Sequence, residues 1–255
     1  MKNKALVRVL LAAGIILIAG ALALTGYNLI TEELAGQERD AILSELDVLI
    51  PAAPQTIDDD FEAVESGEQS ENYETALPTF DEIKRQHLIA TESETGEPAP
   101  QVQGEPQAAA RVTYRTPTVT VDETEYIGKL SMPSIKLQLP IIGSWSMEKL
   151  KVAPCLFYGS VYTGDMVLCA HNYRTHFGQI SRLSVGNRIT FTDVEGNAFA
   201  YRVAKLDRVD PDETEKLIES EYELCLFTCT LSGNKRIVIY CELINVNGAP
   251  VSEQN

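Results

Sequence analysis

The chain begins with a long run of apolar positions. From Val9 to Thr31 there are 23 residues without a charged side chain. A helix rises about 1.5 Å per residue, so this run would span roughly 34 Å, enough for a hydrocarbon layer about 30 Å thick. Basic residues precede the run and acidic residues follow it, which favours an N-terminus on the cytoplasmic side. The pattern therefore predicts a cytoplasmic tip and transmembrane anchor over residues 1–31.

A cleaved signal peptide is the alternative interpretation of the same run. Ala21-Leu22-Ala23 provides the small residues that a cleavage site needs. The run is longer than the apolar core of an ordinary signal peptide, about 7–15 residues, and this favours an uncleaved anchor. Either interpretation places the rest of the chain outside the cytoplasm.

A polar, acidic stretch follows over residues 32–111. Its start can be helical over residues 31–50, because Thr31 is a suitable N-cap and apolar side chains recur near one face before Pro51. Large apolar side chains are scarce beyond that point, so the segment cannot bury enough surface to offset the entropy of ordering. We expect a largely disordered linker in which residues 80–90 could form one short helix, with His87 exposed to solvent.

The rest of the chain, residues 112–255, alternates short β-rich runs with turn residues. Val194–Asn197 has the composition of a hairpin turn, and helical patterns are short, at residues 147–151 and 179–183. Seven or eight strands in this length predict an all-β domain, a closed barrel or a sandwich, rather than a doubly wound sheet. The predicted strands are Tyr126–Met132, Leu137–Ile142, Met166–His171, Arg188–Thr192, Ala198–Asp210, Leu224–Thr228 and Ile237–Leu243.

The formal net charge of -16 is distributed unevenly along the chain. Residues 31–110 carry 20 acidic and three basic side chains, whereas residues 111–255 carry 17 acidic and 15 basic ones. Almost all of the excess negative charge therefore lies in the predicted linker. Nucleic-acid binding requires Lys and Arg side chains clustered against phosphates, so we expect no nucleic-acid partner.

Three residues with catalytic chemistry fall at the ends of predicted strands. His171 and Cys229 each end an apolar strand, and Arg236 begins the next one. A thiol needs a nearby base or cation to act as a nucleophile at neutral pH, and a developing oxyanion needs fixed donors. Each residue alone is more often structural. Together they could supply a nucleophile, a general acid/base and a positive clamp.

The sequence resembles the sortase family at these positions. Leu226-Phe227-Thr228-Cys229 followed by Arg236 is similar to the family's Leu-x-Thr-Cys strand end and the Arg that opens the next strand. Ala170-His171 matches the strand end that carries the family's catalytic His, and the order His, Cys, Arg is the family's order. The segments Tyr126–Leu130 and Leu139–Ile141 resemble its first two strands, so the resemblance covers about residues 124–246.

The resemblance implies a closed eight-stranded β-barrel and a membrane-anchored cysteine transpeptidase of Gram-positive bacteria. Cys229 would attack the Thr–Gly bond of a Leu-Pro-x-Thr-Gly-like sorting signal at the C-terminus of a surface protein. Arg236 would stabilise the oxyanion and substrate, His171 would be the general acid/base, and Thr228 would help to form the substrate site. An amine of a peptidoglycan precursor or a pilin would then resolve the thioacyl-enzyme. No cofactor is implied, although some sortases bind calcium.

Some residues depart from the family pattern and leave the subclass open. The Cys229–Arg236 interval is shorter than in many members, so Lys235 competes for the role of Arg236, which we prefer because it abuts the strand. Asn172 follows His171, as in some class B enzymes, but residues 207–224 are too short for the helical insert of that class. No second apolar span follows Leu243, which disfavours the pilin-polymerising class with a C-terminal anchor.

Five cysteines are an odd number for an exported protein. With Cys229 free, the other four could form two disulfides, but we expect buried free thiols, since Cys in an apolar strand packs as a small hydrophobe. These four are Cys155, Cys169, Cys225 and Cys241.

Two metal sites are conceivable from the residue types. Acidic residues cluster between Asp207 and Glu215, but without the regular spacing of a calcium loop, so we expect a solvated acidic loop there. His171, His176 and Cys169 are a weaker zinc candidate, because structural zinc takes four well-spaced ligands.

Two other functions remain open from the residues alone. One is a cell-wall cysteine peptidase or an L,D-transpeptidase-like enzyme. The signature of L,D-transpeptidases has an Arg two residues after the Cys, and this chain has Leu231 at that position. A non-catalytic binding barrel on an acidic tether is the other.

Overall fold

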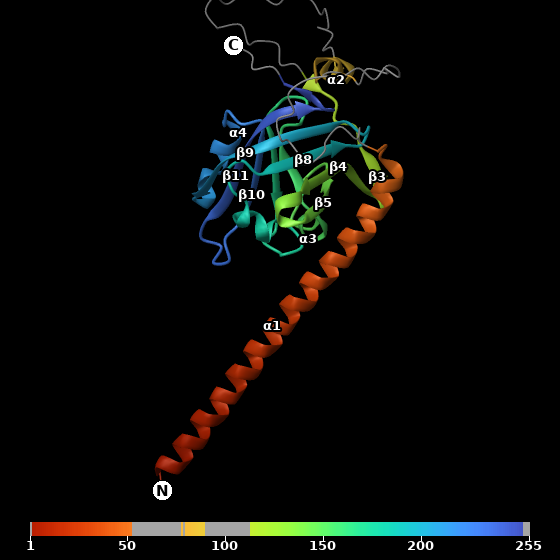
Figure 1. Cartoon of the computed structure of the whole chain (residues 1–255). Coiled ribbons are helices and arrows are strands. Elements are labelled where there is room, and N and C mark those ends of the chain that lie inside the picture. Colours follow the sequence, from red (N-terminus) through yellow and green to blue (C-terminus); the bar gives the residue numbers. More distant parts are fainter. Residues whose placement is uncertain (1, 53–77, 79, 90–112, 252–255) are drawn as a thin grey trace, which may run out of the picture.

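The computed structural model describes residues 2–52, 78, 80–89 and 113–251. A long N-terminal helix, α1, runs along one side of a β-barrel and projects far beyond it (Figure 1). Most of the predicted linker, residues 53–77 and 90–112, lies outside the described residues.

Helix α1 extends over Lys2–Leu49 without a break. Its apolar part, Leu10–Tyr27, is long and apolar enough to cross a membrane and has no residue buried within the protein. The helix that we predicted for residues 31–50 is present, and it is continuous with the apolar part of α1. Residues 35, 42, 46 and 50 follow one face of this part, and their side chains are buried against the barrel.

The barrel confirms the predicted closed eight-stranded fold. Its strands hydrogen-bond in the order β10-β7-β6-β5-β4-β8-β9-β11, and β11 returns to β10 to close the sheet. The short strands β3 and β12 extend the sheet beside β4 and β11. The bounds are β3 Val119–Val121, β4 Thr124–Met132, β5 Leu137–Ile142, β6 Cys155–Tyr158, β7 Met166–Ala170, β8 Arg188–Asp193, β9 Ala198–Val209, β10 Leu224–Cys229, β11 Arg236–Val246 and β12 Ala249–Pro250.

One strand of the barrel was not predicted, and two of the barrel pairs are parallel. Strand β6 was not predicted, because it is only four residues long and directly follows Pro154. Strand β10 pairs with β7 in parallel, and β5 pairs with β6 in parallel, whereas the other barrel pairs are antiparallel. The predicted hairpin turn is present between β8 and β9, where Asp193 Oδ1 accepts hydrogen bonds from the backbone N–H groups of Glu195 and Asn197.

Alternate side chains of the strands point to two separate apolar layers. Leu168 of β7 and Leu226 of β10 lie in the barrel interior together with Phe199 and Tyr201 of β9. Their strand neighbours belong to a second layer on the outside of the sheet, which we call the outer cluster. Its buried members are Ile42, Leu46, Ile50, Val121, Tyr126, Ile142, Ala153, Cys155, Val167, Cys169, Val194, Val209, Leu217, Cys225, Phe227, Val238 and Tyr240.

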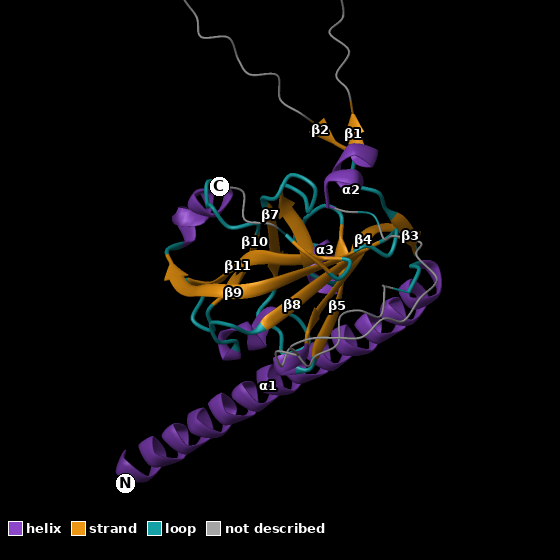
Figure 2. Ribbon diagram, turned by 45° about the horizontal axis from the view of Figure 1, so that its top comes forward, coloured by secondary structure: helices purple, strands orange, loops and turns teal. Residues whose placement is uncertain are grey.

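The short helix predicted within residues 80–90 is present as α2, Phe80–His87, at one end of the barrel (Figure 2). Ile83 has no exposed surface and packs into the barrel interior. The prediction that His87 is exposed is wrong: its ring is 8% exposed, lies 4.3 Å from the ring of Tyr162 and contacts Glu195 at 3.0 Å. Strand β1, Leu88–Ile89, continues from α2 and pairs with β2, Thr113–Tyr114.

The remaining helices are short and lie in the connections between strands. Of the two predicted ones, α3 at Lys149–Val152 begins two residues later than predicted, and η2 at Phe177–Arg182 begins two residues earlier. The others are η1 at Pro133–Ile135, η3 at Pro211–Thr214 and α4 at Glu215–Ile218.

Candidate active site

Strands β7 and β10 bring the predicted catalytic His and Cys to the same end of the barrel. The two strands are parallel, and Ala170 is the register partner of Thr228. His171 and Cys229 are the residues that follow this last pair. The residues are 58 positions apart in the chain, and only the parallel pairing of their strands makes them neighbours.

Strand β11 adds the arginine from the other side. Cys229 and Arg236 are direct register partners across the antiparallel β10–β11 pair. Phe227, two residues before Cys229, belongs to the outer cluster, as does Val238, two residues after Arg236. Because side chains alternate along a strand, Cys229 and Arg236 share the outer face of the sheet. All three candidate residues retain partial exposure to solvent.

Thr228 occupies the opposite face. Its side chain is 1% exposed, and its hydroxyl donates a hydrogen bond to the Ala170 carbonyl at 2.8 Å. This bond links β10 to β7 next to Cys229 and His171. The contact of Thr228 with a substrate stays a prediction, since the described hydroxyl is used inside the barrel.

The two cations that compete for the arginine role have different partners. Lys235 Nζ forms an ion pair with Asp210 at 2.7 Å, on the loop that follows β9. Arg236 Nη1 donates to the Gly233 carbonyl at 3.2 Å within the β10–β11 turn. The engaged ammonium of Lys235 and the direct register of Arg236 with Cys229 both favour Arg236.

Comparisons with known proteins assign a family to the barrel region. The sortase domain family model matches residues 130–244, which include His171, Cys229 and Arg236. The barrel is a sortase domain. Sortase A of Bacillus anthracis is 31% identical over 134 residues, which are 49% of this chain and 63% of that protein. The match therefore covers less than two thirds of this relative.

Solved structures of sortases are also similar to the chain. Sortase C of Streptococcus pneumoniae has a TM-score of 0.44 and 22% identity, over 49% of this chain and 69% of that one. Sortase A of Corynebacterium diphtheriae has a TM-score of 0.44 and 20% identity, over 52% and 65% of the two chains.

The surroundings of His171 in the sortase domain favour its neutral form. Burial lowers the pKa of the imidazole below its usual 6.5, and the positive charge of Lys151 on α3 lowers the pKa further. Tyr173 lies alongside, with ring centroids 5.0 Å apart. A neutral imidazole can accept a proton from a thiol, which is what a general base beside a Cys nucleophile must do.

An aromatic row leads along the outer face toward Cys229 and was not predicted. The ring of Phe227 contacts that of Phe157 on β6 edge-on, with centroids 5.2 Å apart. Trp145 lies 5.6 Å beyond Phe157 and is 48% exposed. These rings come from three separate segments, so no local pattern groups them. They form an apolar surface beside the candidate nucleophile.

The other cysteines of the sortase domain are free thiols, as predicted. All four are buried, whereas Cys229 is partly exposed. Burial raises the pKa of Cys225 to about 11 and that of Cys155 to about 12, and it also raises the pKa values of Cys169 and Cys241. A thiol reacts as the thiolate, so Cys229 is the cysteine placed for nucleophilic chemistry.

The predicted metal candidates do not assemble into a ligand set. Within residues 2–52, 78, 80–89 and 113–251, no group of three or more His, Cys, Asp or Glu side chains is arranged to hold a metal ion. In the acidic loop, Asp207, Asp210 and Glu213 form ion pairs with lysines. His176 is fully buried. Calcium binding was only a possibility from the residue types, and these contacts add nothing in its favour.

Proposed function

We propose that this sortase domain is a cysteine transpeptidase that acts outside the membrane on proteins with a Leu-Pro-x-Thr-Gly-like sorting signal. The observation that carries the proposal is the direct register of Cys229 with Arg236, beside the strand end that carries His171. A thiol, a base and a guanidinium meet on one partly exposed face. The apolar row next to them suits the apolar positions of such a signal.

In the first half-reaction, His171 accepts the thiol proton of Cys229, and the thiolate attacks the Thr–Gly carbonyl carbon. Arg236 stabilises the negative charge that develops on the carbonyl oxygen. When the C–N bond breaks, the imidazolium of His171 gives its proton to the leaving Gly amine. The products are a thioacyl-enzyme and the released C-terminal peptide.

In the second half-reaction, an acceptor amine attacks the thioester carbonyl. His171 takes the amine proton and returns it to the Cys229 sulfur as the C–S bond breaks. The product is a new amide bond between the surface protein and the acceptor. A peptidoglycan precursor and a pilin Lys both provide a suitable primary amine. The same domain would act as a hydrolase where water replaces the amine.

The cellular placement follows from α1. An 18-residue stretch of α1 with a mean hydropathy of 2.1 and no buried residue supports a single-pass membrane anchor near the N-terminus. The basic residues that precede it support a cytoplasmic N-terminus and an extracellular sortase domain.

The test measures cleavage and transfer by the full chain in detergent micelles. Fluorogenic peptides with Leu-Pro-x-Thr-Gly-like sequences are supplied together with a primary amine. We expect Cys229→Ala to reduce both activities on the order of a thousandfold, because no other group can form the thioester. Cys225→Ala is the matched control, since it removes a buried thiol from the same strand, and should retain activity within about threefold.

Two further variants assign the cation. Arg236→Ala should lose activity by about a hundredfold or more, whereas Lys235→Ala should change it by less than about threefold. Intact-mass measurement should find the thioacyl adduct on Cys229 in the absence of amine. Cleavage that persists in Cys229→Ala, or no adduct with any peptide of a broad panel, would contradict the proposal and favour a non-catalytic barrel.

A further inference from the structure

The direction in which α1 passes the barrel relates the catalytic end to the predicted membrane anchor. Early in the docked part, Gly36 lies against Thr175, four residues after His171, and a Cβ at Gly36 would be 3.0 Å from Thr175 Cγ2. At the other end, Pro51 lies against Gly196 in the β8–β9 turn, where a Cβ at Gly196 would be 2.9 Å from the Pro51 carbonyl oxygen. The helix therefore enters at the catalytic end and leaves at the opposite end.

The docking of α1 is extensive along this path. Leu46 is completely buried, and Ile42 and Ile50 are also buried in the outer cluster. Asp47 forms an ion pair with Lys129 of β4 at 2.6 Å. These contacts bind the last four turns of α1 to the sheet, so the orientation of the barrel follows that of the helix.

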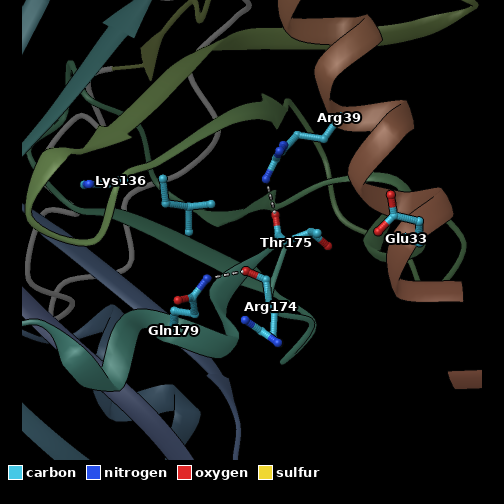
Figure 3. A pocket seen from close by; sticks show the side chains of 7 residues that line it. Glu33, Arg39, Lys136, Arg174, Thr175 and Gln179 are labelled. Carbon is cyan, nitrogen blue, oxygen red and sulfur yellow. Dashed lines mark hydrogen bonds between the residues drawn. The ribbon is translucent and has the colours of Figure 1, made fainter. Parts of the chain in front are cut away.

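The junction at the catalytic end is polar. Arg39 Nη1 donates to the Thr175 carbonyl at 3.5 Å, and Figure 3 shows this side chain reaching from α1 toward the loop that follows β7. A pocket of about 400 Å³ opens there between the helix and the barrel, and Glu33, Lys136 and Arg174 also line it. Charged side chains on every side suit a position at the polar surface of a membrane.

Only a short length of α1 separates the contact of Gly36 with the barrel from the uncharged run that ends at Thr31. Gly36 is five residues after Thr31, or about 8 Å along an unbroken helix. The headgroup layer on each side of a bilayer is roughly 5–8 Å thick. The N-terminal part of α1 projects away from the barrel in both views (Figures 1 and 2).

We propose that α1 is a rigid strut that turns the catalytic end of the barrel toward the membrane and holds it next to the headgroups. The height and direction of the catalytic end relative to the bilayer are thereby set by the helix. This inference rests on the proposed anchor and on the proposed transpeptidase function.

The first test measures orientation and does not depend on activity. The full chain with Cys229→Ala is reconstituted in phosphatidylglycerol and phosphatidylethanolamine vesicles and labelled at Leu231→Cys, in the β10–β11 turn, or at Ala249→Cys, in β12 at the opposite end. Leu231 is 97% exposed and Ala249 is also exposed, so both labels are accessible. We expect stronger energy transfer to lipid-headgroup dyes from position 231. Equal transfer from both positions, or stronger transfer from 249, would overturn the proposal.

The second test changes the height of the barrel. Seven helix-forming residues inserted between Thr31 and Glu32 add about 10 Å and close to two full turns, so the docked face of α1 keeps its direction. Cleavage of a soluble peptide should be unchanged, whereas cleavage of the same sequence attached to a membrane-embedded apolar segment should fall about tenfold or more. Three extra residues placed in the embedded substrate, between its cleavage motif and its apolar segment, lengthen it by about 10 Å. This substrate should then be cleaved by the insertion variant at the original rate.

The control is the same seven-residue insertion after Ala52, beyond the docked part of α1, which should affect neither substrate. If the first insertion leaves cleavage of the embedded substrate unchanged, α1 does not set the height and the proposal fails. If the unmodified protein cleaves neither substrate, the proposed function fails, and the energy-transfer measurement still decides the orientation.

Discussion

Replacing His176 with phenylalanine should make the protein more stable, and increasingly so as the pH falls. His176 lies in the loop between β7 and η2 and has no exposed surface. Neither ring nitrogen has a partner that meets hydrogen-bond geometry. Burial lowers the pKa of His176 to about 4, and the charge of His171 adds to this shift, which the nearby Val152 carbonyl only partly offsets.

The sign and size of the effect follow from proton linkage. The unfolded chain binds a proton at His176 below about pH 6.5, whereas the folded chain does so only below about pH 4. The free energy of unfolding is therefore unaffected by His176 protonation above about pH 6.5, and it decreases as the pH falls from 6.5 to 4. With about 1.4 kcal/mol for each pKa unit, the loss is on the order of 3 kcal/mol.

The assay is urea unfolding of the full chain in detergent at several pH values between 7 and 4. The free energy of unfolding is compared between the unmodified protein and His176→Phe, so that carboxylates that titrate in the same range cancel. The variant should match or exceed the unmodified protein at pH 7, because it also removes two unpaired buried nitrogens. Its advantage should grow by about 3 kcal/mol at pH 4.

Salt provides the control, since a shift caused mainly by burial is screened much less than one between exposed charges. The pH dependence of the difference should therefore be similar at low and high ionic strength. A difference between the two proteins that stays constant from pH 7 to 4 would refute the reasoning, because it would mean that His176 is protonated equally in both states.

Three further outcomes follow from the same structure. Thr228→Val should lower the free energy of unfolding by about 1–3 kcal/mol and reduce activity, because the Ala170 carbonyl loses its donor, and Thr228→Ser should recover most of both in denaturation and peptide assays. Thiol titration of the folded chain should find one fast-reacting cysteine, absent in Cys229→Ala, with the other four reacting only on unfolding. Gly128→Ala should destabilise the barrel by about 3 kcal/mol or more in thermal unfolding, since Gly128 has a φ of 153° and a Cβ there would collide with the Thr192 carbonyl oxygen.

Local patterns identified most of the long elements of this protein, but not β6. The uncharged run predicted the apolar part of α1, and the alternation of apolar and turn residues predicted the other barrel strands to within three residues at each end. Both patterns depend on neighbours in the chain, where helix and strand periodicity and burial are expressed directly. The strand ends that carry His171, Cys229 and Arg236 could be found for the same reason, although their proximity could not be shown.

Pairing between distant segments was decided by tertiary structure. The parallel β7–β10 register brings the strand ends that carry His171 and Cys229 together, and the ring contacts that lead from Trp145 to Phe227 join three separate segments of the chain. No property of a short segment specifies which strand becomes its neighbour. That choice depends on which arrangement buries the most apolar surface and leaves the fewest backbone groups unpaired.

The segments outside the barrel show the same division. Composition predicted an acidic stretch after the apolar run, and most of the excess negative charge of the chain lies in that stretch. The contacts of Ile83 and His87 with the barrel, and the burial of Leu46 against the outer sheet, depend on surfaces that exist only after the strands have closed. The sequence by itself thus determined the apolar N-terminal helix, most of the strands and the order of His171, Cys229 and Arg236. The closed sheet decided which strand ends lie together and which end of the barrel adjoins the apolar part of α1, because both require contacts between residues far apart in the chain.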